Sequence, residues 1–294
     1  MVCCALWGSA TPSIKAGYEI FKIDSSDTLS IILFAGIRFF LAGILVVLFQ
    51  SIKAHAFIKP EKGSFPSIFK LAMAQTVIQY FCFYVGLAHT SGVTGTIISG
   101  ASGFFSILLA SLVFHYEKLT SGKILGCIMG FLGIIVMNIS LKGGYSFHFA
   151  LNGEFLVLLS TVSLALSGIL MKKYSKNFNV VMLSGYQFIL GGLIMIVVGF
   201  SLGGRVALVP QVSAYILLIY MAFISAMAYS LWGILLENNP VSKVTIYSFL
   251  TPLFGVVLSA IFLGEVSQAL SLNKLLALIL VSGGIFVVNR KKDS

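Results

Sequence analysis

Polar side chains recur at helical spacing inside otherwise apolar stretches, and they are the residues that could hold a solute. Gln75 and Gln79 lie four residues apart, and Tyr229 and Trp232 lie three residues apart, so each pair shares one helical face. Amide, phenol and indole groups can replace part of the water around a polar solute, while aromatic faces add apolar contact. The pattern therefore indicates a site that holds a small solute by hydrogen bonds and apolar contact.

Hydroxyl side chains extend this pattern to other apolar stretches. The candidates for contact with the solute are Trp7, Gln75, Gln79, Thr96, Ser99, Ser163, Ser167, Tyr229, Trp232 and Tyr247. The serines have an alternative interpretation, because small residues also let membrane helices pack closely. Trp232 also has an alternative interpretation, as part of an interfacial aromatic belt, since tryptophan is enriched at membrane–water interfaces.

Charged residues are scarce in these stretches, and three of them are candidates for charge recognition or coupling. Arg38 could face an anionic group of the solute or bond helix-end carbonyls near the outer surface. Glu117 and Glu265 each follow a long uncharged stretch. They could accept hydrogen bonds from the N-terminal amides of the following helix, or they could take up a proton. No Asp or Glu lies deep in an apolar stretch, so a simple buried-carboxylate relay is not expected.

The sequence lacks the signatures of other chemistries. Neither HExxH nor GxSxG occurs, and the four cysteines form no CxxC pair. We therefore expect no enzyme activity, no metal site and no cofactor. The net charge of +10 is spread over connecting segments and forms no single patch, so nucleic acid is not expected as a partner.

The elements that must position these residues are membrane helices. The chain is 58% hydrophobic and 10% charged, whereas soluble domains carry roughly 25% charged residues. Ten apolar stretches approach the length needed to cross hydrocarbon, at residues 1–14, 31–49, 71–88, 93–114, 124–141, 155–171, 178–204, 215–236, 244–263 and 275–288. The first lacks a basic n-region, so it is read as a helix and not as a cleaved signal peptide. The predicted fold class is an all-α polytopic membrane protein with ten transmembrane helices.

Basic residues predict the orientation of these helices. Alternate connecting segments carry thirteen Lys and Arg on one side and four on the other. Because cytoplasmic loops are enriched in Lys and Arg, both termini are predicted to be cytoplasmic, in a multi-pass protein of the plasma membrane.

The two glutamates reveal an internal repeat. An offset of 148 residues pairs Glu117 with Glu265, and the flanking stretches align with it. Residues 1–143 and 151–290 then form two repeats of five helices each. Because five is odd, the second repeat enters the membrane from the opposite side, as in many transporter folds.

Short motifs add a resemblance to a known family. They are WGSATPSIK at 7–15, IRFFLAG at 37–43, the Glu-Lys pair after the fourth stretch, and LGE at 263–265. With them the chain resembles the drug/metabolite transporter superfamily, in its ten-helix EamA-type branch. One departure is Phe104, whose counterpart in the second half is Pro252.

The resemblance implies two inverted five-helix repeats around a central cavity, and export of small metabolites such as amino acids by alternating access. Its partners would be a small-molecule substrate and the lipid bilayer. We expect the cavity between the first, third, fourth, sixth, eighth and ninth helices. Glycines in the fifth and tenth helices, Gly126, Gly130, Gly133, Gly283 and Gly284, would serve as scaffold or as a homodimer face. A drug efflux carrier and a non-transporting membrane receptor or scaffold remain the alternatives.

Overall fold

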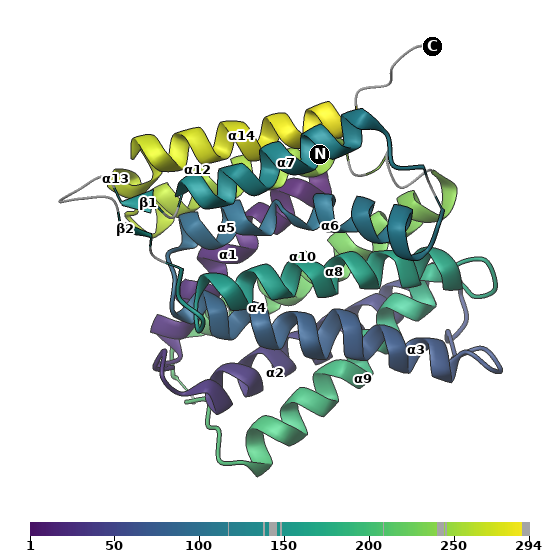
Figure 1. Ribbon diagram of the computed structural model, residues 1–294. Helices are drawn as coiled ribbons and strands as arrows, with labels where there is room; N and C mark the ends of the chain where they lie inside the picture. The colour runs from purple at the N-terminus through teal and green to yellow at the C-terminus, as the bar shows by residue number, and fades with distance from the viewer. Residues whose placement is uncertain are drawn as a thin grey trace.

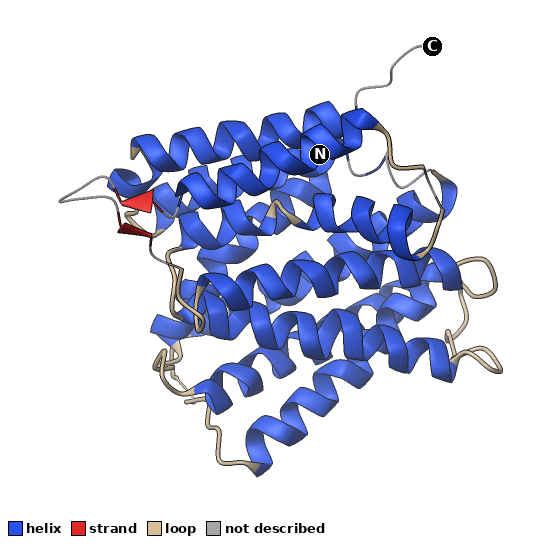
Figure 2. Cartoon of the chain, viewed as in Figure 1, coloured by secondary structure: helices blue, strands red, loops and turns tan. Residues whose placement is uncertain are grey.

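The fold is almost entirely helical. The structure, a computed structural model, describes residues 1–116, 118–137, 139–140, 146–147, 149–207, 209–239, 244 and 246–289. Glu117, one of the two paired carboxylates, lies outside these residues. Figure 2 shows helices throughout, with one short antiparallel pair of strands, β1 (Ile139–Ser140) and β2 (Ser146–Phe147).

Six helical segments among the described residues are long and apolar enough to cross a membrane. They are α2 (Thr28–Lys53), α3 to α4 (Phe65–Ala88), α5 to η2 (Gly92–Val113), α8 (Glu154–Tyr174), α9 (Val180–Ser201) and α10 (Val212–Asn238). Four further helices are shorter or more polar: α1 (Val2–Ile20), α7 (Ser121–Met137), α12 (Leu250–Phe262) and α14 (Leu272–Asn289). The multi-helix membrane architecture predicted from composition is thus present.

Two of the long segments contain changes of helix type. The pieces of the first are α3 (Phe65–Leu71), the π-helical η1 (Ala72–Ile78) and α4 (Gln79–Ala88). The pieces of the second are α5 (Gly92–Ser99), α6 (Ser102–Leu108) and the π-helical η2 (Leu109–Val113). A 3₁₀ turn, η3 (Ile246–Phe249), precedes α12, and the short α13 (Val266–Ala269) precedes α14. Because π turns shift the side-chain register, regular α-helical spacing does not predict which side chains share a face in the segment that carries Gln75.

Some helices extend beyond the apolar stretches that predicted them. Helix α1 continues past residue 14 to Ile20, and α3 begins at Phe65, ahead of residue 71. Apolar content marks only the part of a helix that sits in hydrocarbon. Backbone hydrogen bonding continues into the more polar ends, such as the turn that contains the exposed Glu19.

Side-chain caps define where several helices begin. The Asp27 carboxylate accepts a hydrogen bond from Ser30 N at 3.0 Å, at the start of α2. Ser91 Oγ accepts from Thr94 N at the start of α5, and Asn179 Oδ1 accepts from Met182 N at the start of α9. Each cap satisfies one of the amides that a helix leaves without an intrahelical partner.

Two pairs of helices form opposite edges of the bundle. Figure 1 shows α7 and α14 side by side at one edge and α2 with α9 at the other. Glycine permits the close contact of α2 with α9, because a Cβ added at Gly192 would lie 2.4 Å from Phe40 N. At the other edge, a Cβ at Gly284 would lie 2.6 Å from Gly126 O.

The glycines of α7 and α14 therefore act within one chain. A Cβ at Gly130 would lie 1.9 Å from the ring of Phe104, a fully buried side chain. Gly130 thus leaves room for the phenyl ring that stands where the second half has Pro252. The homodimer remains a prediction, and the scaffold role of these glycines is the one that the packing supports.

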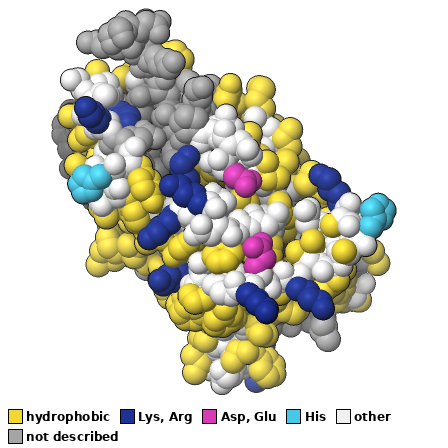
Figure 3. Space-filling model, turned by 90° about the vertical axis from the view of Figure 1, so that its right-hand side faces the viewer, with side chains coloured by type: hydrophobic (Ala, Val, Ile, Leu, Met, Phe, Trp, Pro, Cys, Tyr) yellow, Lys and Arg dark blue, Asp and Glu magenta, His cyan; other side chains and the backbone are white. Residues whose placement is uncertain are grey.

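Lysine and arginine side chains gather at one end of the bundle (Figure 3). This end holds the connections α2–α3, η2–α7 and α8–α9, where Lys53, Lys62, Lys118, Lys173 and Lys176 are exposed. We call it the lysine-rich end. The opposite end holds the connections α1–α2, α4–α5, α7–α8, α9–α10 and α12–α14.

Candidate functional site

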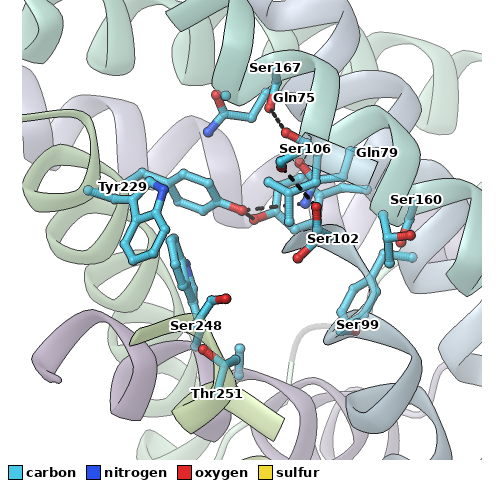
Figure 4. Close-up of a pocket in the computed structure, with 18 of the residues that line it drawn as sticks. Gln75, Gln79, Ser99, Ser102, Ser106, Ser160, Ser167, Tyr229, Ser248 and Thr251 are labelled. Atoms are coloured by element: carbon cyan, nitrogen blue, oxygen red, sulfur yellow. Dashed lines mark hydrogen bonds between the residues drawn. The ribbon is translucent and has the colours of Figure 1, made fainter. Parts of the chain in front are cut away.

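A cavity opens in the middle of the bundle, between α1, the α3–α4 segment, the α5–η2 segment, α8, α10 and α12. Its volume is about 1390 Å³, open solvent at its mouth included. Among the described residues, α7, α9 and α14 contribute nothing to its wall. The lining helices are the six named from the sequence, joined by Arg38 from α2. Figure 4 shows the polar side chains of these helices converging on the same space.

Most of the candidate residues line this cavity. They are Trp7, Arg38, Gln75, Gln79, Thr96, Ser99, Ser167, Tyr229 and Trp232. Two candidates lie elsewhere. Ser163 is buried against the α3–α4 segment, where its Oγ donates to Ala74 O at 2.6 Å. Tyr247 is 54% exposed and outside the cavity wall.

A cluster of three aromatic side chains in the wall comes from two facing helices. The Trp7 ring of α1 lies between Tyr229 and Trp232 of α10, with centroid separations of 5.1 Å and 5.0 Å and edge-to-face geometry. Edge-to-face contact is a favoured arrangement for aromatic rings, so it helps hold the three side chains in place. Trp232 lines the cavity, which supports the first of its two interpretations. Both tryptophans of the chain therefore lie in the cavity wall.

A hydrogen-bonded group lies beside this aromatic wall. Tyr229 and Tyr80 share a hydrogen bond between their hydroxyls, and Gln79 Nε2 donates to Tyr229 Oη at 3.4 Å. Tyr80 was not among the candidates, because it is displaced by about 100° from Gln79 on a regular helix. The π-helical η1 immediately before Gln79 alters the register between Gln75 and α4, which carries both Gln79 and Tyr80, and no feature of the apolar pattern signals it.

Four buried polar atoms of the wall residues have no hydrogen-bond partner in the part of the chain that the structure describes. They are Trp7 Nε1, Gln79 Oε1, Thr96 Oγ1 and Thr251 Oγ1. Buried polar groups are nearly always paired in folded proteins, so four unpaired atoms around one cavity call for a ligand or ordered water. Together they offer an indole donor, an amide acceptor and two hydroxyls that can do either.

Arg38 is held firmly at the edge of the cavity. Its side chain is 2% exposed, and its Nε donates to Met221 O at 3.0 Å. Its Nη2 donates to Ser225 Oγ at 3.0 Å, and its Nη1 donates to the hydroxyl of Tyr84. The carbonyl that it bonds lies inside α10 and not at a helix end, which corrects one of the two sequence interpretations.

Several other hydroxyl residues reach the cavity that the candidate set omitted. They are Thr11, Ser102, Ser106, Ser160, Thr161, Ser248 and Thr251. Ser102 and Ser106 follow the i, i+4 spacing, and Ser106 Oγ donates to Ser102 O at 2.8 Å. Their spacing was visible in the sequence, but small polar residues equally suit helix packing, so spacing alone could not select them.

Glu265 lies away from the cavity, at the end opposite the lysine-rich one. Its carboxylate accepts hydrogen bonds from Gly92 N at 3.0 Å and Val93 N at 2.9 Å. These are amides of the first turn of α5. The sequence interpretation expected Glu265 to accept from N-terminal amides of the helix that follows it, so it was right about the kind of donor and wrong about which helix supplies it. The charge also complements the positive end of the α5 dipole. A second contact joins α14 to the N-cap of α5, since Lys274 Nζ donates to Ser91 Oγ at 3.4 Å.

Comparison with known proteins decides the family. The sequence profile of the EamA-like transporter family matches residues 1–139 and again residues 151–290. The chain belongs to the EamA-like transporter family. It is therefore a multi-pass membrane transporter and not an enzyme, and the resemblance to the drug/metabolite transporter superfamily is confirmed. Its partners are a small-molecule substrate and the lipid bilayer.

Individual relatives come from bacteria, archaea and plants. The chain is 29% identical to the uncharacterized transporter YvbV of Bacillus subtilis, over 98% of this chain and 90% of that one. It is 26% identical to an uncharacterized transporter of Archaeoglobus fulgidus, over 97% of this chain and 95% of that one. A WAT1-related chloroplastic protein of Arabidopsis thaliana is 24% identical over 90% of this chain and 63% of its own length.

A solved crystal structure shares the fold of this EamA-like transporter. It superimposes with a TM-score of 0.66 over 97% of this chain and 93% of that one, at 16% sequence identity. At this identity the likeness concerns the arrangement of helices alone.

Proposed function

We propose that this EamA-like transporter is a secondary carrier that exports small metabolites such as amino acids, by alternating access around the central cavity. The observation that carries the proposal is the cavity itself. It combines an aromatic wall with unpaired polar atoms, which suits a small solute that has both apolar and polar parts.

Helix packing supports an inverted repeat of five plus five helices, with units at residues 1–143 and 151–290. The second helix of one half, α2, packs on its counterpart α9, and the fifth, α7, packs on α14. The third helix of each half packs on the first helix of the other, as α4 with α8 and α10 with α1. Such pairs are expected when two similar units face each other across a pseudo-two-fold axis. In an inverted repeat, exchange of conformation between the two halves moves the opening from one side to the other.

The position of the cavity supports a state that opens toward the lysine-rich end. Its wall extends to Met171 and Leu236, which lie three and two residues before α8 and α10 end at that side. At the opposite end, Glu265 ties the turn before α13 to the first turn of α5. We propose that the lysine-rich end is cytoplasmic, with both termini inside and the protein in the plasma membrane. The cavity then loads from the cytoplasm, as export requires.

Counterflow in proteoliposomes tests the proposal. Purified protein is reconstituted with a panel of unlabelled amino acids and other small amphiphiles inside, and uptake of the labelled compound is followed. At least one compound should exchange faster than in protein-free vesicles. Exchange of none of the panel would contradict the proposal.

Two substitutions connect that activity with the cavity. Gln79→Ala and Trp232→Ala should each weaken solute binding by about 1–3 kcal/mol, or about five- to a hundredfold, because a polar or aromatic contact is lost. Leu132→Ala is the control, since Leu132 lies on α7 with 47% of its surface exposed. Equal effects of all three substitutions, or a large drop in melting temperature, would mean that these residues only pack.

A further inference from the structure

We propose that Arg38 sets the charge preference of the cavity, so that the carrier accepts solutes with a carboxylate or similar anionic group and rejects organic cations. The inference rests on the proposed transport function and names the chemical class of its substrate. It favours anionic and zwitterionic amphiphiles over the cationic compounds that a drug efflux carrier would handle.

The first observation is the charge of the wall. Of the described residues that line the cavity, Arg38 alone carries a charge at neutral pH. Each Asp or Glu that the structure describes lies in a loop or within the first or last few residues of a helix. The hydrogen bonds of Arg38 go to a carbonyl and two hydroxyls, which are all neutral groups. The guanidinium charge therefore acts on the cavity without a carboxylate to cancel it.

The second observation is the rigidity of that charge. Arg38 bonds to α4 and α10, and its guanidinium carbon lies 5.0 Å from the centre of the Phe39 ring and 5.9 Å from that of Tyr84. Tyr18 Oη in turn donates to Tyr84 O at 2.9 Å. A charge held this way cannot swing to water, so its field persists whether or not a solute is bound.

The third observation is the kind of polar atom left unpaired. Trp7 Nε1–H can only donate a hydrogen bond, and it is buried without an acceptor among the described residues. Thr96 Oγ1 can donate as well, and its side chain is 2% exposed. These two donors suit an electron-rich group on the solute, in agreement with the sign of the field from Arg38. The unpaired acceptor Gln79 Oε1 suits a hydrogen-bond donor elsewhere on the same solute, as a zwitterion would supply.

Intrinsic fluorescence gives a direct readout, because both tryptophans of the chain line the cavity. The probes are four compounds with one phenyl ring and no indole: phenylacetate, phenylalanine, 2-phenylethanol and 2-phenylethylamine. They are titrated into the purified full chain. A charge on the solute about 8 Å from the guanidinium, at an effective dielectric constant of about 20, changes the affinity roughly thirtyfold relative to a neutral solute. We expect phenylacetate to bind at least about tenfold more tightly than phenylethylamine, with phenylalanine and phenylethanol between them.

Substitutions separate the charge from a packing role. Arg38→Gln should remove the difference between phenylacetate and phenylethylamine, whereas Arg38→Lys should keep their order. Arg205→Gln is the matched control, because it deletes the same charge from an exposed loop position. Equal binding of the anion and the cation by the unaltered protein would overturn the inference, and that measurement needs no variant to fold. An equal loss of affinity for all four compounds in Arg38→Gln would also overturn the inference.

Counterflow of the same four compounds distinguishes this inference from the proposed function. Binding in the expected order without exchange of any bound probe would overturn transport and leave the charge preference intact. Exchange of phenylethylamine as fast as phenylacetate would overturn the charge preference and leave transport intact.

Discussion

Glu265→Gln should open the end of the transporter opposite the lysine-rich one. The carboxylate joins the two halves there through Gly92 N and Val93 N. A glutamine keeps the size of the side chain but has one carbonyl oxygen and no charge, so one of the two bonds and the attraction to the α5 N-terminus are lost. The state closed at this end therefore loses stability relative to the state open at this end.

The size of the effect follows from these two bonds. A hydrogen bond to a charged group contributes about 1.5–3 kcal/mol when buried. Glu265 is only partly buried, so solvent screening reduces the loss to about 1–2 kcal/mol. This corresponds to about a five- to thirtyfold larger population of the state open at this end.

Labelling of Ser99→Cys measures that population. Ser99 lines the cavity, and the four native cysteines are first replaced. A maleimide that cannot cross the membrane is added outside intact cells, and the rate of modification is compared with and without Glu265→Gln. Glu19→Gln serves as the matched control, because it removes an exposed carboxylate from the same end. The reasoning is refuted if Glu265→Gln leaves the rate unchanged, or if Glu19→Gln raises it equally.

Two further predictions concern topology and packing. The impermeant maleimide should modify Ser267→Cys in intact cells and leave Lys62→Cys unmodified, because these exposed positions lie at opposite ends of the bundle. The reverse labelling pattern would show that the lysine-rich end faces outward. Gly192→Ala should lower the melting temperature by roughly 3–10 °C, since its Cβ would lie 2.4 Å from Phe40 N. Gly168→Ala, where a Cβ meets nothing within 4 Å, should leave it unchanged, and equal shifts for both variants would contradict the packing argument.

The apolar pattern predicted the helices well because membrane helices must satisfy their backbone internally over a fixed thickness. Their polar ends were harder to predict, as the extension of α1 to Ile20 shows, since hydrocarbon imposes no composition there. Gln79, Tyr229 and Trp232 could be predicted as cavity residues because large amphipathic side chains are uncommon at lipid-facing positions near the membrane midplane.

Contacts between helices far apart in the chain were not predictable from spacing. Ser163 follows the helical face of Ser167, yet its hydroxyl bonds the backbone of a neighbouring segment. Glu265 could be predicted to accept helix amides, but only the packed structure identifies α5 as the donor helix. Such pairings depend on how the halves dock, and one sequence carries no direct signal for it.

Blocking the cavity tests whether solute crosses the membrane through it. The Ser99→Cys protein is reconstituted, modified with a bulky maleimide, and assayed by counterflow with a compound that the unmodified protein exchanges. Leu132→Cys, modified with the same reagent on exposed α7, is the control. Exchange should stop when Ser99→Cys is modified and continue when Leu132→Cys is modified. Undiminished exchange through fully modified Ser99→Cys protein would contradict transport through the cavity.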